Sequence, residues 1–386
     1  MLIRHKTDGT PYARPYLGRD QDGKPIRPYR EFAGMTDAEA EAAATEWLNE
    51  WASTHDPSAT TARQALNDYV DNLQALGNSH NTIRMYRHYT DAYLLDLANK
   101  PVADITTQDL DHNIMQLLTE GTRPNHPLSA STVQTYRAFL QGAWKTFTRH
   151  GLVELNVARE TMRPQSSRHE AVALDDADMQ ELVKAVREDL SVCPMPEDTI
   201  AMAKRSKALA VLLALSTGAR VGEVAALRVR DVSLAMSRIT ISGNVVMVGG
   251  MPTRQEKTKG KRTRTVTIDQ NLTQTLRDHL DWMRRTFEPV TRNTPLCTMD
   301  GTHMPPERLS HGFAEYRNRL GLDCALTFHS LRHTHATMLL QQGVNARVIQ
   351  ERLGHANVTT TLSIYGHVMP TNDYEAAQAF ANSINA

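Results

Sequence analysis

Arg220 and Glu223 stand three residues apart in the segment STGARVGEVAAL, just after a glycine-containing turn and at the expected start of a helix. That spacing places both side chains on one helical face. An arginine there can present two parallel N–H donors to a phosphodiester, while the glutamate orients a neighbouring group. Taken alone, the pair also fits a surface ion pair that contributes little to stability.

A basic run follows in RQEKTKGKRTRTVTI, where six residues from Arg254 to Arg264 are basic and only Glu256 is acidic. β-prone residues flank Gly260, so we expect a hairpin that turns there. A lysine near its tip can protonate a leaving oxygen, because an ammonium gives up a proton and a guanidinium effectively does not. The alternative is a solvated basic hairpin that binds phosphates without catalysis.

The segment TFHSLRHTHATMLLQQG places His329 three residues before Arg332, near the start of a helix. We expect Leu331, Met338 and Leu339 to form its buried stripe. His329 and Arg332 then lie on one face and point the same way, where both can contact a phosphate.

The histidines of this helix raise the alternative of a zinc site, because histidine is the commonest metal-binding side chain. His329, His333 and His335 do not follow the HExxH pattern, and no glutamate or cysteine accompanies them on the helix. We therefore expect no metal here.

The segment VIQERLGHANVTTTLSIYGHV supplies the last candidates. One helix is expected to end at Gly354, with His355 in the turn and a second short helix that ends near Tyr365. Taken alone, each residue fits an ordinary structural role, His355 as a turn histidine and Tyr365 as a core aromatic.

The order Arg-x-x-Glu, basic-hairpin lysine, His-x-x-Arg, Gly-His and Tyr resembles the catalytic domain of the tyrosine recombinases, the phage-integrase family to which lambda integrase belongs. The motifs TGARVGE, HSLRHTHAT, LGH and TTLSIYGHV occur in this order between Thr217 and Val368. The layout of the whole chain is similar as well. Its basic N-terminus resembles that of integrases of conjugative transposons and temperate phages, which carry an arm-binding sheet.

The resemblance implies a role for each matching position. Arg220 and Arg332 match the two arginines that clamp the scissile phosphate, and Tyr365 matches the nucleophile. His329 and His355 match the positions that hydrogen-bond the non-bridging oxygens and assist proton transfer.

Two further roles are implied by the same match. Glu223 corresponds to the acidic support residue. Lys257 stands where the family has its strand lysine, but Lys259 and Lys261 are close enough that a shift in register would exchange them.

A phenol has a pKa near 10, so Tyr365 needs its proton taken up and the phosphate charge neutralised as it attacks. The resemblance implies a 3′-phosphotyrosyl intermediate and a free 5′-hydroxyl, with Lys257 protonating the leaving oxygen. Because the covalent link retains the phosphoester energy, neither ATP nor another cofactor is expected. The cationic side chains take the place of a metal ion.

Two rival functions use the same residues. A type IB topoisomerase shares the chemistry but relaxes supercoils without strand exchange. A DNA-binding regulator with a decayed active site would only bind phosphates.

These residues need several domains to position them, as a chain of 386 residues allows. We expect a multidomain, mainly α-helical protein. Residues 1–57 form an arm-type DNA-binding domain with a small β-sheet plus a helix, and residues 58–162 a four-helix SAM-like core-binding domain. Residues 163–174 form a linker, and residues 175–386 a mixed α+β catalytic domain with a C-terminal helix.

Local patterns support that division. Turn signals and β-prone pieces predict a strand meander in the first thirty residues. Helical periodicity and caps predict a helix from Thr36 to Trp51, with an aspartate at its N-cap, and then four more helices. These four are Thr61 to Leu76, Ser79 to Ala98, Thr106 to Glu120 and Ser129 to His150.

Basic residues in these segments and in the run from Arg254 to Arg264 are candidates for gripping DNA phosphates, although a mixed charged surface also accounts for them. The DNA-binding candidates are Arg14, Arg19, Lys24, Arg84, Arg87, Lys145, Lys259, Lys261 and Arg262.

The amino-acid composition excludes several classes of protein. Lys+Arg and Asp+Glu both number 43, which argues against a uniformly basic coat but leaves local patches open. Three separated cysteines predict neither a disulfide framework nor a zinc ribbon, and the longest apolar run is too short for a membrane span. We expect a bacterial cytoplasmic protein, associated with the nucleoid when bound to DNA.

The expected partners follow from the resemblance. They are double-stranded DNA at core and arm attachment sites, a homotetramer on two DNA sites, an excisionase and a DNA-bending protein, with no membrane.

Overall fold

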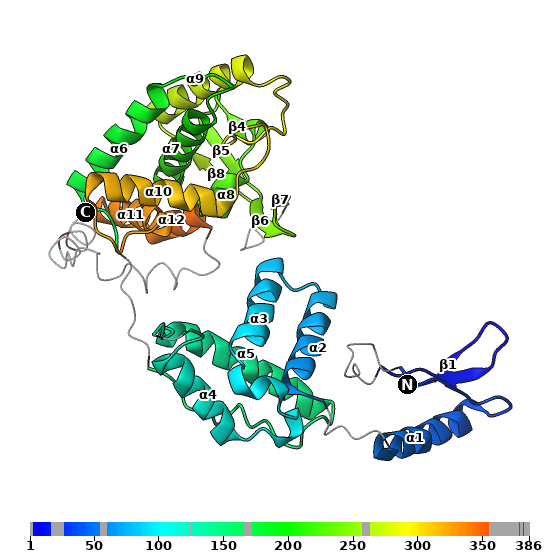
Figure 1. Cartoon of the computed structure of the whole chain (residues 1–386). Coiled ribbons are helices and arrows are strands. Elements are labelled where there is room, and N and C mark those ends of the chain that lie inside the picture. Colours follow the sequence, from blue (N-terminus) through cyan, green and yellow to red (C-terminus); the bar gives the residue numbers. More distant parts are fainter. Residues whose placement is uncertain are drawn as a thin grey trace. The chain divides into compact units, whose positions relative to one another are not determined.

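The computed structural model describes residues 3–16, 27–54, 60–123, 125–165, 172–256 and 263–354, with residues 378 and 381. The chain divides into two compact units, Met1–Arg168 and His169–Ala386 (Figure 1). The division falls in the polar stretch expected to be a linker. The domain boundaries expected from the sequence remain predictions.

The N-terminal module is a small sheet with a helix packed on it, and the expected meander and helix are confirmed. Its core consists of Ile3, Ala13, Phe32, Ala40 and Ala44. The helix cap differs from the prediction, because Thr36 bonds to the Glu39 carboxylate and Asp37 is the first helical residue. The elements are β1 (Ile3–His5), β2 (Pro11–Ala13), β3 (Arg30–Glu31) and α1 (Asp37–Thr54).

The rest of the first unit is helical, and its four predicted α-helices are confirmed. The segment predicted from Ser79 to Ala98 is shorter, because α3 ends at Ala92 and Leu95 has a positive φ of 49°. The elements are α2 (Ala62–Ala75), α3 (His80–Ala92), η2 (Leu95–Asn99), η3 (Val102–Asp104), α4 (Thr107–Thr119) and α5 (Ala130–Arg149).

Hydroxyl side chains fix where these helices begin. In both α3 and α5, a serine N-cap accepts from the backbone N–H of a threonine three residues on. The same hydroxyl lies 2.8 Å from the threonine hydroxyl, in Ser79 with Thr82 and in Ser129 with Thr132. Such caps satisfy N–H groups that have no partner within the helix.

The second unit is built around α7, which carries the longest apolar run of the sequence. Because α7 is apolar on nearly all sides, it is buried, and it packs against α6, α10 and α11 (Figure 1). The helices are α6 (Asp176–Ser191), α7 (Thr199–Thr217), α8 (Val221–Ala225), η4 (Val229–Asp231), α9 (Gln270–Thr286), α10 (Pro306–Leu320), α11 (Phe328–Gln341) and α12 (Ala346–Leu353).

Two small antiparallel sheets complete the described part of this unit, with orders β4-β5-β8 and β6-β7. The hairpin expected around Gly260 is wrong in its pairing. Among the described residues, β7 pairs with β6 and β8 pairs with β5, so the strands on either side of residues 257–262 belong to different sheets. The strands are β4 (Val232–Ser233), β5 (Arg238–Ile241), β6 (Asn244–Val248), β7 (Met251–Gln255) and β8 (Arg264–Thr267).

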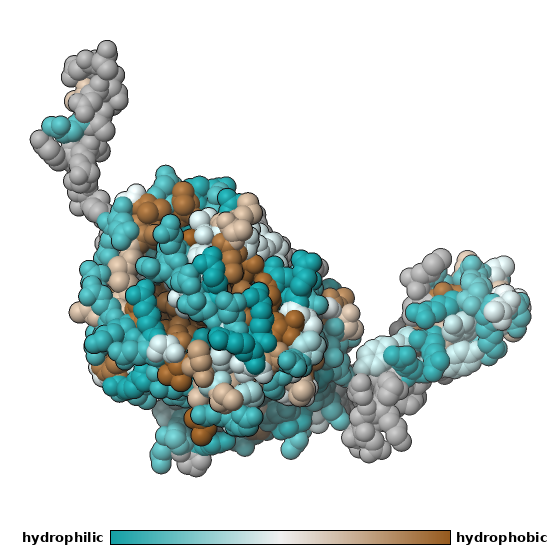
Figure 2. Space-filling model, turned by 90° about the horizontal axis from the view of Figure 1, so that it is seen from above, coloured by the Kyte–Doolittle hydropathy of each residue, from teal (hydrophilic) through white to brown (hydrophobic). Residues whose placement is uncertain are grey.

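The surface in view mixes hydrophilic and hydrophobic residues (Figure 2). No helix of the described residues has the length and apolar character needed to cross a membrane.

Candidate active site

Arg220 is placed by a tight turn between two helices. Gly218 ends α7 in the left-handed region, with φ of 66°, and Arg220 is the N-cap of α8. The Glu223 carboxylate accepts from the backbone N–H of Arg220 at 3.0 Å and from its Nη1 at 3.1 Å. The predicted pair therefore exists, and the Arg220 side chain is 28% exposed.

Glu223 is only 1% exposed and has a second cationic partner. Nη2 of Arg264, on β8, donates to Glu223 Oε2 at 2.6 Å. Burial alone would raise the pKa of the Glu223 carboxyl. The hydrogen bond and charge of Arg264, together with the backbone N–H and charge of Arg220, outweigh burial and hold that pKa below its usual value. Glu223 is therefore a carboxylate at neutral pH.

Arg332, on α11, joins the two turns that lead to predicted catalytic residues. Its side chain is buried, at 2% exposure. Nη1 donates to the carbonyl oxygen of Gly218 at 2.6 Å, and Nη2 donates to that of Leu353 at 2.7 Å. The turn before Arg220 and the end of α12, two residues before His355, are thus held by one guanidinium.

His329 lies on the exposed side of the first turn of α11. Its ring meets that of His333 edge-on, with centroids 4.7 Å apart. Burial, followed by the charge of Arg332, holds the pKa of His333 below its usual value. The stripe predicted on this helix is only partly right, since Leu331 is buried whereas Met338 and Leu339 are half-buried.

His335, weighed from the sequence as a metal ligand, has a different role. Its Nδ1 lies 2.8 Å from the Leu215 carbonyl oxygen, and its Nε2 accepts from Nε of Arg352 at 2.9 Å. Because arginine Nε is always a donor, the imidazole carries its proton on Nδ1. Both ring nitrogens are therefore engaged. Across the described residues, no cluster of three histidine, cysteine or acidic side chains is arranged for a metal.

Arg352 ties the end of α12 to the rest of the site. Besides His335, it donates to the carbonyl oxygens of Thr267 and Ser216, each at 3.0 Å. The C-terminal ends of α7 and α12 and the end of β8 are thereby held together.

Lys257, His355 and Tyr365 lie outside the described residues, as do Lys259 and Lys261. The residue before Lys257 is anchored, however. Glu256 forms ion pairs with Arg254 Nη1 at 2.5 Å and with Arg228 Nη1 at 3.4 Å. Arg254 Nε also donates to the carbonyl oxygen of Ala226, just after α8.

Sequence reasoning missed three arginines that organise this site, the buried Arg264 and the half-buried Arg254 and Arg352. Arg254 and Arg264 had been assigned only to a basic, anion-facing run. For Arg264 a signal exists, because it alternates in phase with the apolar Val266 on β8 and with Ile268 just after the strand, and is therefore expected to point inward.

The predicted DNA-binding residues have different surroundings. Arg14, Arg84 and Lys145 are exposed. Arg87 forms an ion pair with Asp71 at 2.7 Å, which offsets its charge. Lys145 lines a hollow whose other basic residues are Arg149 and Arg159. Arg19, Lys24 and Arg262 lie outside the described residues.

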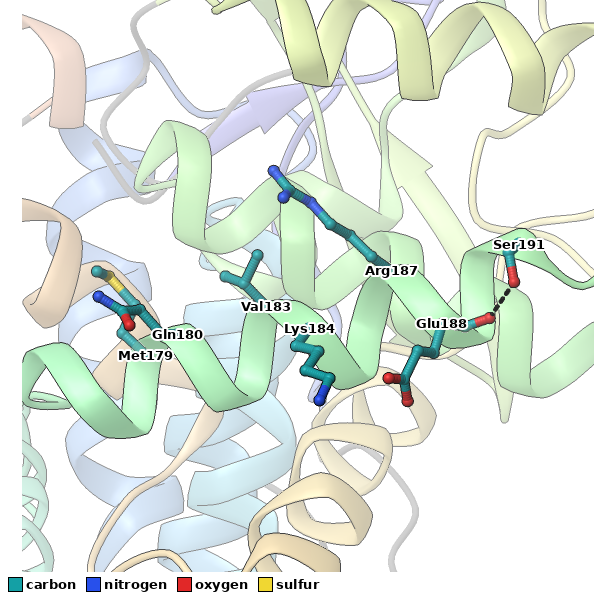
Figure 3. A pocket seen from close by; sticks show the side chains of 7 residues that line it. All are labelled: Met179, Gln180, Val183, Lys184, Arg187, Glu188 and Ser191. Atoms are coloured by element: carbon teal, nitrogen blue, oxygen red, sulfur yellow. Dashed lines mark hydrogen bonds between the residues drawn. The ribbon is translucent and has the colours of Figure 1, made fainter.

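A separate hollow runs along α6 (Figure 3). Its described lining includes none of the residues predicted to act on DNA. The lining residues are Met179, Gln180, Val183, Lys184, Arg187, Glu188 and Ser191.

The site thus unites an anchored arginine at the start of α8, a buried carboxylate and a second arginine that reaches both flanking turns. The sequence model of the phage integrase family matches residues 172–372 and includes all of these positions. The chain belongs to the phage integrase family. It is accordingly a tyrosine recombinase, a site-specific enzyme that cleaves and rejoins DNA.

Curated relatives of this recombinase cover most of the chain. It is 25% identical to the tyrosine recombinase XerC-like of Caldanaerobacter subterraneus subsp. tengcongensis, over 94% of this chain and 93% of that protein. It is 29% identical to tyrosine recombinase XerD of Corynebacterium glutamicum, over 76% of this chain and 89% of that protein.

Solved structures share its fold. The Tn1549 transposon integrase in complex with transposon right end DNA matches with a TM-score of 0.64 and 19% identity, over 85% of this chain and 100% of that one. A lambda integrase tetramer bound to a Holliday junction matches with a TM-score of 0.55 and 20% identity, over 93% of this chain and 96% of that one. The recombinase is thus a mainly helical multidomain protein with a small N-terminal sheet and the integrase catalytic fold.

Proposed function

We propose that this recombinase integrates or excises a mobile element, such as a prophage or a conjugative transposon, with Tyr365 as its nucleophile. The observation that carries the proposal is the grip of Arg332 on the carbonyl oxygens of Gly218 and Leu353. It places one buried guanidinium between the turn that bears Arg220 and the turn that leads to His355.

In the proposed reaction, Arg220 and Arg332 neutralise the scissile phosphate, and His329 and His355 hydrogen-bond its non-bridging oxygens. Tyr365 Oη forms a bond to phosphorus as the bond from phosphorus to the 5′-oxygen breaks. The phenol gives its proton to one of these two histidines, and the 5′-oxygen gains one from Lys257. Attack by a 5′-hydroxyl of the second duplex releases Tyr365 and joins the exchanged strands.

The N-terminal module of residues 3–54 supports an integrase in particular. It adds a small sheet, whose strands carry Arg4 and Arg30, with a helix packed on it, ahead of the helical region. Such a module suits a second class of DNA site, the arm site. The lambda integrase structure named above is a tetramer on a Holliday junction. We propose the same assembly here, on two double-stranded DNA sites, assisted by an excisionase and a DNA-bending protein.

The nucleophile is tested by trapping the covalent complex on a nicked core-site duplex that loses a short fragment upon cleavage. Tyr365→Phe should abolish the protein–DNA adduct and leave binding of the site nearly unchanged, because only the attacking oxygen is removed. The matched control is Tyr316→Phe, which removes a buried hydroxyl that donates to Asp189 at 2.6 Å. It should still form the adduct, and an adduct with Tyr365→Phe would refute the assignment.

The biological role is tested separately, since the relatives named XerC-like and XerD make a Xer-like function the second candidate. A two-site recombination assay would use, as its two DNA sites, the ends of the element that are found in the DNA flanking this gene. Recombination there that needs residues 1–57 supports the integrase role. Recombination that does not need them, between sites unrelated to an element's ends, supports the Xer-like role.

A further inference from the structure

Arg264 is a buried arginine at the start of β8 that contacts two parts of the active site. Its side chain is 7% exposed. Nη2 donates to Glu223 Oε2 at 2.6 Å, and Nε donates to the carbonyl oxygen of Arg352 at 2.8 Å. It thus connects the carboxylate beside Arg220 with the end of α12.

The first contact changes the charge available at Arg220. Glu223 is bonded to the N–H and Nη1 of Arg220, and with no other partner it would offset the charge of that guanidinium. Arg264 supplies a second positive charge at 2.6 Å. The three groups together carry one net positive charge, and Arg220 is the more exposed of the two arginines.

The second contact fixes the path of the chain toward His355. Arg264 holds the carbonyl oxygen of Arg352, and Arg332 holds that of Leu353, the next residue. Gly354 follows with φ of 68°, and a Cβ there would lie 3.1 Å from Cδ of Arg264. The glycine lets the chain pass close to the arginine, so the two sides of the contact are fitted to each other.

We propose that Arg264 is a positioning residue for strand cleavage. It acts through Glu223 to keep the guanidinium of Arg220 aligned and its charge uncompensated, and it holds the end of α12 in place. The inference rests on the proposed role of Arg220 as a phosphate clamp.

A substrate with a neutral scissile group separates this role from simple structural support. A methylphosphonate replaces one charged non-bridging oxygen with a methyl group, so less positive charge is needed to approach the transition state. If a variant is slow because it offers too little positive charge to the phosphate, its loss of cleavage rate should be smaller on that substrate. A defect in folding or in DNA binding should be the same on both substrates.

The experiment measures single-turnover cleavage of nicked core-site duplexes that carry either a phosphodiester or a methylphosphonate. The variants are Arg264→Gln, Arg264→Lys and Arg220→Gln, in the full-length protein. Arg205→Gln is the matched control, because Arg205 is also buried and also bonds to backbone carbonyls, those of Leu190 and Val192. Thermal melting and site binding are measured for each variant, and assays run well below every melting point.

We expect Arg264→Gln to slow cleavage of the phosphodiester about 100-fold, since a small misplacement of a clamp is costly. On the methylphosphonate, the deficit should fall to about tenfold or less. Arg264→Lys keeps a positive charge beside Glu223 but cannot make both contacts, so it should fall between Arg264→Gln and the parent. For Arg205→Gln, the cleavage rate relative to the parent should be the same on both substrates.

Each outcome has a distinct meaning. The positioning role of Arg264 alone would be overturned if Arg264→Gln slowed cleavage equally on both substrates while the deficit of Arg220→Gln was smaller on the methylphosphonate. A deficit for Arg220→Gln that is equal on both substrates would overturn the clamp role, and the inference with it. If Arg264→Gln does not fold, Arg264→Met, which keeps the apolar stem, takes its place in the same comparison.

Discussion

Nη1 of Arg332 donates a hydrogen bond to the carbonyl oxygen of Gly218 at 2.6 Å, although the two residues are 114 positions apart. Gly218 lies at the end of α7, two residues before Arg220. A side chain from α11 therefore sets the start of α8, and the two predicted phosphate clamps are positioned as one unit.

Arg332→Ala should damage both stability and catalysis. Two carbonyl oxygens, those of Gly218 and Leu353, lose charged donors in a buried place, which costs on the order of 3 kcal/mol in the free energy of unfolding. Cleavage should fall on the order of 100- to 1000-fold. Urea denaturation and trapping of the covalent complex measure the two effects.

Arg332→Lys separates these effects, because it keeps the charge but cannot reach both carbonyl oxygens at once. It should recover part of the stability and little of the cleavage. A lysine variant as active as the parent would show that the fork of Arg332 is unimportant.

Gly218→Ala should destabilise the site through a steric clash. The new Cβ would lie 2.4 Å from Cδ2 of Leu353 and 3.0 Å from Cδ2 of His335, both buried. Gly218 also has φ of 66°, where a side chain costs about 1–2 kcal/mol. Displacement of Leu353 would also disturb its bond to Arg332, so cleavage should fall together with stability.

Gly343→Ala is the control for backbone strain. Gly343 has φ of 75°, and nothing lies within 4 Å of the position of a new Cβ. It should lose only the stability that a side chain at positive φ costs, and its cleavage rate should stay near that of the parent. Equal melting temperatures for the two variants would show that the close approach at Gly218 has no cost.

Cleavage should not depend on a divalent metal ion. In the proposed reaction, guanidinium and ammonium groups supply the positive charge that many phosphoryl-transfer enzymes take from Mg²⁺. Single-turnover cleavage at saturating protein and constant ionic strength should be equal in EDTA and in Mg²⁺. A strict requirement for the ion would contradict the assigned roles of Arg220 and Arg332.

Much of the helical structure could be predicted because its signals are local. The caps at Thr61, Ser79, Thr106 and Ser129 lie within three residues of the groups that they bond. In contrast, β-prone residues on either side of a glycine fit a hairpin and fit two strands of separate sheets equally well. The pairing of β8 with β5 depends on residues about 25 positions away, so no local pattern revealed it.

The site was predictable only in part, for a similar reason. The roles of Arg220 and Arg332 came from the resemblance to a family, not from their spacing. Arg264 reaches Glu223 and Arg352 across 41 and 88 positions. Its alternation with Val266 indicates that it points inward, but nothing in the sequence indicates which groups it meets there.

Stability should fall as the pH is lowered from about 6.5 to 4, partly because of His335. Burial, followed by the charge of Arg352, lowers the pKa of His335 to about 4. In this window the unfolded chain binds a proton that the folded protein excludes, because Nε2 already accepts from Arg352. Each such group removes about 1.4 kcal/mol of stability per pH unit.

His279 should contribute in the same way. It is fully buried, and burial, followed by the charge of Arg205, lowers its pKa to about 3. The measurement is the free energy of unfolding in urea at several values between pH 7 and pH 4. The variant His335→Gln can still donate to Leu215 or accept from Arg352. It should reduce the slope of the unfolding free energy against pH by up to the contribution of one histidine, and His279→Gln should reduce it by that of a second. A slope unchanged by His335→Gln would mean that His335 is already protonated in the folded protein, and the bond from Arg352 could not then exist as described.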